Sequence, residues 1–125
     1  MNYSSTLPPR GTVREWLDYH AEKTPDRICY LFSDGASDLT WLTLRNHAKK
    51  ITFGLTHLGI KKGESIAICM SNGRPALLTL YAILYGGFRA TPLNLAAGPA
   101  ALGHAIFHSK CRYICSAPGQ SKILL

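Results

Sequence analysis

The sequence predicts an α/β fold in which an N-terminal helix and a β-hairpin precede a βαβαβ unit with parallel strands. From residue 65 onward, short runs rich in branched residues alternate with longer apolar runs of helical period, a pattern typical of parallel strands joined by right-handed crossovers. Glycine or proline marks most of the boundaries between runs. Antiparallel pairing of the first two strands of this unit would exclude the predicted fold.

The first element is predicted to be a helix that begins at Thr12. Thr12 and Glu15 have the spacing of a capping box, in which the hydroxyl and the carboxylate accept hydrogen bonds from free backbone N–H groups. Pro25 lies just past the predicted end of the helix. The face expected to point inward is formed by Val13, Trp16, Leu17, His20 and Ala21.

A hairpin and a second helix are predicted next. Arg27–Phe32 is rich in branched and aromatic residues, Asp34-Gly35 is the strongest turn signal in the chain, and Leu39–Trp41 forms the returning strand. The helix is expected to start near Thr43 and to end at Gly59, which can adopt a left-handed conformation. Steps of four and three residues place one apolar face on Leu44, Ala48, Ile51, Leu55 and Leu58.

The βαβαβ unit occupies the rest of the chain. Its strands are predicted at Ser65–Cys69, Phe88–Leu93 and Arg112–Cys115, and its helices at Arg74–Tyr85 and Gly98–His108. The apolar run from residue 75 to 88 is shorter than the roughly 20 residues of a membrane helix, so we expect no membrane span.

Length and composition indicate one partial domain. Residues 1–11 are expected to be loose because of Pro8-Pro9, and residues 12–125 to form the folded part. Charged residues make up 17% of the chain, below the roughly 25% of a typical domain. The low charge suggests that part of the surface faces a partner or the rest of a larger chain.

The charge pattern and the cysteines restrict partners and location. The net charge is +7, but no basic run exceeds two residues and no aromatic residues interleave with a basic stripe, so we expect no nucleic acid partner. The four cysteines lack the spacing of a redox pair or zinc knuckle, and Met1–Pro9 lacks the apolar stretch of a signal peptide. Reduced thiols without a secretory signal predict a cytoplasmic protein.

Three features could carry chemistry, and each has a simpler structural interpretation. Residues 116–122 resemble a phosphate loop but hold one glycine, which favours a surface turn. His104 and His108 could share a helix face as metal ligands, yet no acidic residue lies between them. Ser71-Asn72-Gly73 could bind an anion at a helix start, but an ordinary Asn72 cap explains it. We therefore assign no catalytic, cofactor-binding or metal-binding residue.

The order of several short motifs resembles the start of the adenylate-forming (AMP-binding) ligases, the family of acyl-CoA synthetases. The resemblance extends from Thr12 to about Cys115. Its motifs are Pro25-Asp26-Arg27, Leu39-Thr40-Trp41, Leu55 with Leu58-Gly59, Gly63-Glu64-Ser65-Ile66-Ala67-Ile68, Asn72, Tyr85-Gly86-Gly87-Phe88 and Pro92-Leu93-Asn94. Ser71 departs from the family, which often has proline before the asparagine.

The resemblance implies a part of the large N-terminal domain of an enzyme that uses ATP, Mg and coenzyme A. Such enzymes convert a carboxylic acid to an acyl-adenylate and pass the acyl group to a thiol. The family's phosphate loop, ribose-binding aspartate and catalytic lysine would lie beyond Leu125, so we expect residues 1–125 alone to be inactive and to bind no cofactor. The alternative is a non-catalytic α/β module that associates through an exposed sheet edge.

Overall fold

Residues 11–117 are described by the computed structural model of the chain, and a three-stranded parallel sheet lies at their centre. Strands β3 (Ser65–Cys69), β4 (Arg89–Pro92) and β5 (Tyr113–Ser116) are arranged in the order β4-β3-β5. Ile66 of β3 is in register with Ala90 on one side and with Tyr113 on the other, and both pairings are parallel. The predicted βαβαβ unit is confirmed.

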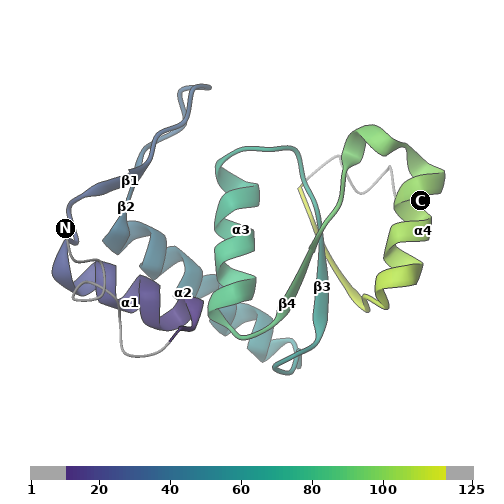
Figure 1. Cartoon of the computed structure of the whole chain (residues 1–125), viewed down its shortest axis with the longest axis horizontal. Coiled ribbons are helices and arrows are strands. Elements are labelled where there is room, and N and C mark those ends of the chain that lie inside the picture. Colours follow the sequence, from purple (N-terminus) through teal and green to yellow (C-terminus); the bar gives the residue numbers. More distant parts are fainter. Residues whose placement is uncertain (1–10, 118–125) are drawn as a thin grey trace.

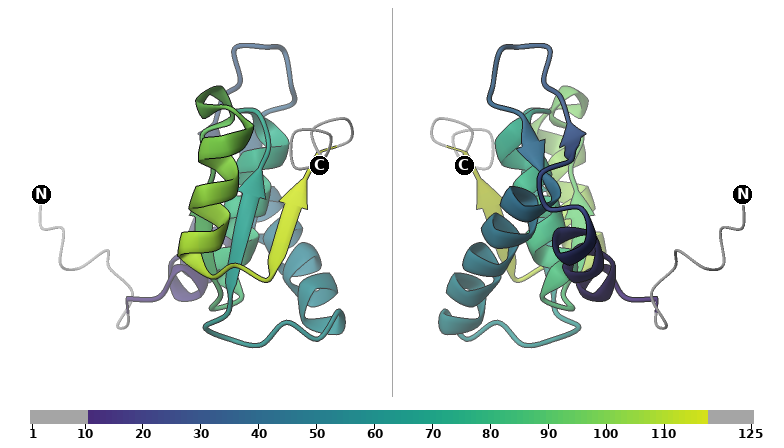
Figure 2. Two further views of the ribbon diagram at one scale, coloured as in Figure 1. Left: turned by 90° about the vertical axis from the view of Figure 1, so that its right-hand side faces the viewer. Right: turned by 90° about the vertical axis from the view of Figure 1, so that its left-hand side faces the viewer.

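Two helices cover opposite sides of this sheet. The first crossover contains α3 (Arg74–Tyr85), and the second contains the short 3-10 helix η2 (Leu95–Ala97) and α4 (Pro99–Ser109). The first crossover leads from β3 to β4 and the second leads back past β3 to β5, so right-handed connections place their helices on opposite faces. Figures 1 and 2 show α3 and α4 on the two sides of the strands.

The N-terminal part of the chain packs on α3, away from α4. Helices α1 (Val13–Lys23) and α2 (Trp41–His57) lie beside α3, and the hairpin of β1 (Ile28–Tyr30) and β2 (Leu39–Thr40) extends past them (Figure 1). The hairpin is antiparallel, as predicted, but its first strand is shorter than expected, and the register shifts between its two paired positions.

The interior consists of two apolar clusters that both include residues of α3. One joins the first two helices and the hairpin to α3, and its buried members are Leu17, Leu39, Leu44, Ala48, Leu78, Ala82 and Tyr85. The other joins the sheet to the end of α2, and its buried members are Leu55, Ile60, Ile66, Ile68, Ile83 and Phe88. Ile51 packs against both clusters. Helix α4 contributes one fully buried side chain, Leu102.

Threonine hydroxyls start the first two helices. The Thr12 hydroxyl accepts from the Glu15 N–H at 3.2 Å, as predicted. The Glu15 carboxylate accepts from that hydroxyl at 3.0 Å, so its recorded bond is to a side chain and not to the expected backbone group. Helix α2 starts at Trp41, two residues before the expected position, because Thr40 and Thr43 form a complete capping box.

One predicted core residue lies on the surface. Leu58 is 76% exposed, although its spacing from Leu55 places it on the inward stripe. Helix α2 ends at His57 and Leu58 is its C-cap, so the stripe stops one step earlier. Ile60, after the turn, is buried in the second cluster in its place.

The four cysteines, Cys29, Cys69, Cys111 and Cys115, are free thiols, and Cys69 is buried while the other three are half-buried.

Candidate functional site

The candidate site lies where β3 and β4 end. The connection after β3 leaves toward α3, while the connection after β4 leaves toward α4 on the other face. Such a switch between adjacent parallel strands opens a crevice beyond their carboxyl ends, where α/β sheets bind ligands. The Leu93 N–H donates to the Ile68 carbonyl at 3.0 Å and holds the two strand ends together.

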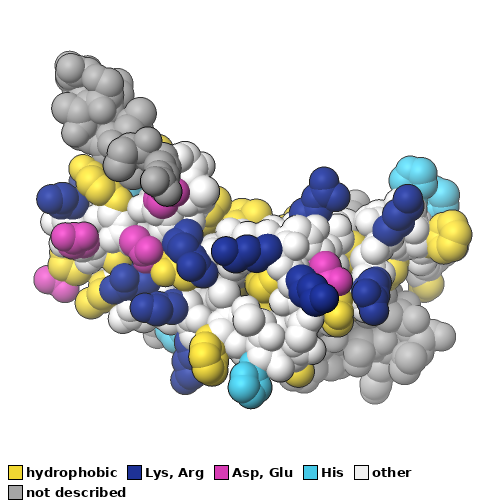
Figure 3. Space-filling view, turned by 90° about the horizontal axis from the view of Figure 1, so that it is seen from below, with side chains coloured by type: hydrophobic (Ala, Val, Ile, Leu, Met, Phe, Trp, Pro, Cys, Tyr) yellow, Lys and Arg dark blue, Asp and Glu magenta, His cyan; other side chains and the backbone are white. Residues whose placement is uncertain are grey.

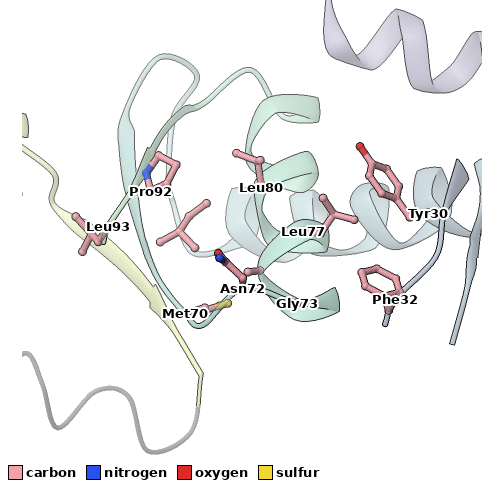
Figure 4. Close-up of a pocket in the computed structure, with 11 residues that line it drawn as sticks. Tyr30, Phe32, Met70, Asn72, Gly73, Leu77, Leu80, Pro92 and Leu93 are labelled. Carbon is pink, nitrogen blue, oxygen red and sulfur yellow. The ribbon is translucent and has the colours of Figure 1, made fainter. Parts of the chain in front are cut away.

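An apolar cavity of about 340 Å³ opens at this position. Its wall combines the hairpin, the ends of both strands and the first turns of α3, as Figure 4 shows. The lining residues are Tyr30, Phe32, Ile68, Met70, Asn72, Gly73, Ala76, Leu77, Leu80, Pro92 and Leu93. Tyr30 and Asn72 carry the polar side-chain groups of this lining, so the cavity is suited to an apolar group.

A second hollow adjoins the first. It has a volume of about 480 Å³ and shares Met70, Asn72, Pro92 and Leu93 with the apolar cavity. Its floor is formed by η2, where the Asn94 side chain accepts from the Ala96 N–H at 3.1 Å. The two hollows together form a crevice that is apolar toward the hairpin and more polar toward η2.

A tyrosine pair fixes the aromatic wall of the apolar cavity. The hydroxyls of Tyr30 and Tyr81 share a hydrogen bond, and the two rings meet edge to face at 5.9 Å. Burial raises the pKa of Tyr81 above the ordinary tyrosine value, and the hydrogen bond to Tyr30 raises it further. Tyr81 is therefore neutral at physiological pH, and its hydrogen bond positions the Tyr30 ring. The sequence analysis missed this wall, which was indicated by the aromatic residues at the alternate positions 30 and 32.

The prediction that Asn72 caps α3 is wrong. Gly73 is the N-cap, and this helix start has no side-chain cap hydrogen bond among the described residues. Gly73 has φ 153°, a value that side chains resist, and Pro75 in the first turn has its φ preset for a helix. With the cap at Gly73, Asn72 lies one residue before the helix and lines both hollows of the crevice (Figure 4).

His104 and His108 share a helix face, as predicted, but no described Cys, Asp or Glu side chain joins them to complete a metal site. His104 and His108 stack at 5.7 Å on the exposed face of α4, and His47 and His57 are exposed on α2, as expected. Within residues 11–117, no three His, Cys, Asp or Glu residues form a group that could hold a metal ion. No described residue is thus assigned to Mg.

The remaining histidine belongs to an aromatic stack. His20 lies between Trp41, with ring centroids 4.5 Å apart, and Trp16, at 5.7 Å. Burial lowers the pKa of His20, and the nearby positive charge of Arg27 lowers it further. A neutral imidazole in this stack joins α1 to α2, so its position indicates a structural role.

The possible phosphate loop begins at Ser116, the last residue of β5, and its residues 118–122 lie outside the described residues.

No helix found within residues 11–117 combines the length and the apolar character needed to cross a bilayer.

Comparison with known proteins gives consistent matches. The family model described as "AMP-binding enzyme" matches residues 17–123. The 2-succinylbenzoate–CoA ligase of Bacillus licheniformis is 30% identical over 99 residues, which are 79% of this chain and 20% of that protein. The enzyme of the same name from Bacillus cereus is 31% identical over 83 residues, or 66% of this chain and 17% of that protein. The chain thus spans about a fifth of the length of these curated relatives.

Solved structures share the fold at lower identity. The N-terminal domain of FACL13 from Mycobacterium tuberculosis superimposes with a TM-score of 0.83 at 19% identity, over 92% of this chain and 29% of that one. The N-terminal subdomain of NpsA from Klebsiella oxytoca, in complex with 3-hydroxyanthranilyl-AMSN, gives 0.77 at 20% identity, over 88% and 27% of the two chains. These similarities show that residues 11–117 have the arrangement found in such N-terminal domains.

Proposed function

Because the chain belongs to the AMP-binding enzyme family, we propose that it is the N-terminal portion of an ATP-dependent ligase that joins a carboxylic acid to coenzyme A or another thiol. In the proposed reaction the carboxylate oxygen attacks the α-phosphorus of ATP and pyrophosphate leaves. The thiol sulfur then attacks the carbonyl carbon of the acyl-adenylate and AMP leaves. The reduced cysteines support a cytosolic location.

The family match over residues 17–123 carries this proposal. The crevice favours a structural, non-catalytic role for this part of the enzyme, because its lining holds no carboxylate, imidazole, ammonium or thiol group. Most of the lining consists of apolar and amide side chains, which supply shape and contact rather than proton transfer or nucleophilic attack. We therefore propose that residues 1–125 contribute sheet and helical shell, and that ATP, Mg and coenzyme A are held by other segments.

A segment exchange tests the proposal. The matched segment of the Bacillus licheniformis ligase is replaced by residues 12–117 of this chain, and acid-dependent exchange between ATP and pyrophosphate is measured with 2-succinylbenzoate and with a panel of other acids. We expect exchange with at least one acid. A cooperatively folded chimera that is inactive with every acid, while the parent ligase is active, would contradict the proposal.

Calorimetry on residues 1–125 tests the second half of the proposal. We expect no micromolar binding of ATP–Mg, because the lining of the crevice offers no cation for phosphates. A micromolar dissociation constant would show that this segment itself holds the nucleotide.

The second candidate function is a non-catalytic module that associates through a sheet edge. It is favoured by β5, an outer strand of the described sheet on which Ile114 is 40% exposed. Such an edge can pair with a strand of another chain. The oligomeric state of the purified chain separates this candidate from the first.

A further inference from the structure

Five cations that are far apart in the sequence meet at the edge where the parallel strands begin. They come from the turn before β3, the start of β4 and the turn before β5, and they are Lys61, Lys62, Arg89, Lys110 and Arg112. All five are exposed. We call this group the basic edge. No basic run in the sequence exceeds two residues, and it is the topology of the sheet that gathers these cations.

Backbone contacts hold the basic edge in place. Arg89 is in register with Ser65, and its N–H donates to the Glu64 carbonyl at 2.9 Å. The Gly63 N–H donates to the Gly87 carbonyl at 2.9 Å and joins the lysine turn to the start of β4. The parallel pairing of β5 with β3 brings Arg112 to the same row. The spacing of the cations is therefore set by rigid elements.

The edge carries a clear excess of positive charge. The three connecting segments, residues 59–64, 86–89 and 110–113, contain five cations and one carboxylate, Glu64. That carboxylate accepts from the Lys61 N–H at 2.9 Å and lies 3.5 Å from Arg112. Figure 3, which views this end of the molecule, shows Lys and Arg side chains around an acidic group below the sheet.

Exposed apolar side chains flank the basic edge. Helices α2 and α4 end where β3 and β5 are about to begin, and Leu58 and Phe107 at these helix ends are 76% and 85% exposed. The Lys110 N–H donates to the Phe107 carbonyl at 3.3 Å, and Phe107 lines one surface hollow together with Lys110 and Arg112. Cations beside exposed apolar groups match a membrane surface, where anionic headgroups lie above acyl chains.

We propose that this edge docks the protein on an anionic lipid membrane. The five cations contact lipid headgroups, and Leu58 and Phe107 enter the boundary between headgroups and acyl chains. Phe107 alone would suit a base or an acyl chain, but Leu58 has no ring on which a base could stack, so the flanking pair favours lipid over nucleic acid. In this orientation the crevice beyond β3 and β4 lies at the end of the sheet that faces away from the membrane.

Vesicle sedimentation tests the proposal on the intact chain. We expect binding to vesicles of phosphatidylcholine with phosphatidylserine, weak binding to phosphatidylcholine alone, and release as NaCl rises from about 0.05 M to about 0.5 M. Each cation near an anionic surface strengthens binding about fivefold. The triple variant Lys61→Gln, Lys62→Gln and Arg89→Gln is therefore expected to bind on the order of 100-fold more weakly.

A matched control separates the edge from overall charge. The triple variant Lys23→Gln, Lys49→Gln and Lys50→Gln removes the same charge from exposed helical positions away from the edge and is expected to lose much less binding. Phe107→Ser should weaken vesicle binding about tenfold. All of these positions are exposed, and unchanged circular dichroism spectra would verify that each variant folds.

Two results would overturn the proposal. Equal losses in the two triple variants would show that net charge alone drives the binding. A duplex oligonucleotide that displaces the protein from vesicles, together with wild-type vesicle binding by Phe107→Ser, would show a nucleic acid surface and not a lipid surface.

Discussion

At the residue scale, a substitution at Gly59 tests the cost of backbone strain in the absence of a steric clash at Cβ. Gly59 has φ 94°, and a Cβ atom built there meets no atom within 4 Å. The cost of a Cβ atom at this position therefore comes from the left-handed backbone itself. We expect Gly59→Val to lower the free energy of unfolding by on the order of 1–2 kcal/mol or more.

Urea denaturation measures this effect, with Lys61→Ala and Lys62→Ala as controls. Both lysines are exposed in the following turn, so each control should change stability by less than about 0.5 kcal/mol. A harmless Gly59→Val would show that the turn can adopt another conformation. The sequence was sufficient to predict the helix stop at this glycine.

His20 makes stability depend on pH. Its folded-state pKa is lowered from the ordinary value of 6.5 by burial and by Arg27, so the unfolded chain binds a proton more readily. The stability contributed by neutral His20 is complete above pH 6.5 and is lost as the pH falls through that value toward the lowered folded pKa. We expect stability to decrease on acidification through this range.

Thermal unfolding at several pH values measures the effect, and His20→Phe is the matched variant. Phenylalanine keeps an aromatic ring between Trp16 and Trp41 but cannot bind a proton. Its unfolding free energy should decrease less on acidification than that of the wild type. Equal pH slopes would show that the shifted titration lies elsewhere.

At the scale of elements, α4 depends on one side chain. Leu102 is 2% exposed and is the one fully buried residue of this helix. Leu102→Ala should lower stability by about 2–5 kcal/mol, whereas Phe107→Ala, at a surface position, should change it by less than about 0.5 kcal/mol. Hydrogen exchange should rise most in α4 and β5. Unchanged protection of these segments would mean that other contacts hold the helix.

The elements also show how far sequence patterns extend. Each predicted helix and strand is present, because apolar period and glycine stops are local properties that the chain itself carries. Two helix starts differ from the predicted ones. The capping box of Thr40 and Thr43 places the start of α2 earlier, and Gly73 instead of Asn72 is the N-cap of α3. Such competition between neighbouring capping residues is settled by tertiary packing.

The site was less predictable than the elements. The crevice combines Tyr30 and Phe32 of the hairpin with Leu93 after β4, and no spacing rule relates these positions. The basic edge has the same origin, because only the strand order β4-β3-β5 brings Arg89 and Arg112 to the same end of the sheet, one on each side of β3. Sites assembled from several connections require the topology, which patterns of apolar residues do not specify.

At the scale of the whole molecule, the association-module hypothesis depends on the outer strand β5. Its pairing with β3 leaves its other side without a strand in the described part of the chain, and Ile114 of this strand is 40% exposed. If the chain acts as an association module, light scattering should show a dimer or larger species, and Ile114→Lys should shift it toward a monomer. A charged side chain on an edge strand discourages pairing with another chain.

The variant Ile66→Lys is the control that distinguishes loss of association from loss of folding. Ile66 is fully buried in β3, so that variant should unfold the sheet and increase aggregation. A wild type that is monomeric and unfolds cooperatively would contradict the association module. A species of the same size in Ile114→Lys as in the wild type would place the contact elsewhere.

The strand order also has a consequence for the sequence of events in folding. Helices α1, α2 and α3 contact one another directly, and the chain segments that connect them are shorter than the segment between β3 and β5. The pairing of Ile66 with Tyr113 instead requires closure of a loop that contains α3, β4 and α4, and such closure slows folding. We expect pulse-labelled hydrogen exchange to protect α2 and α3 first, and the amides of β5 last.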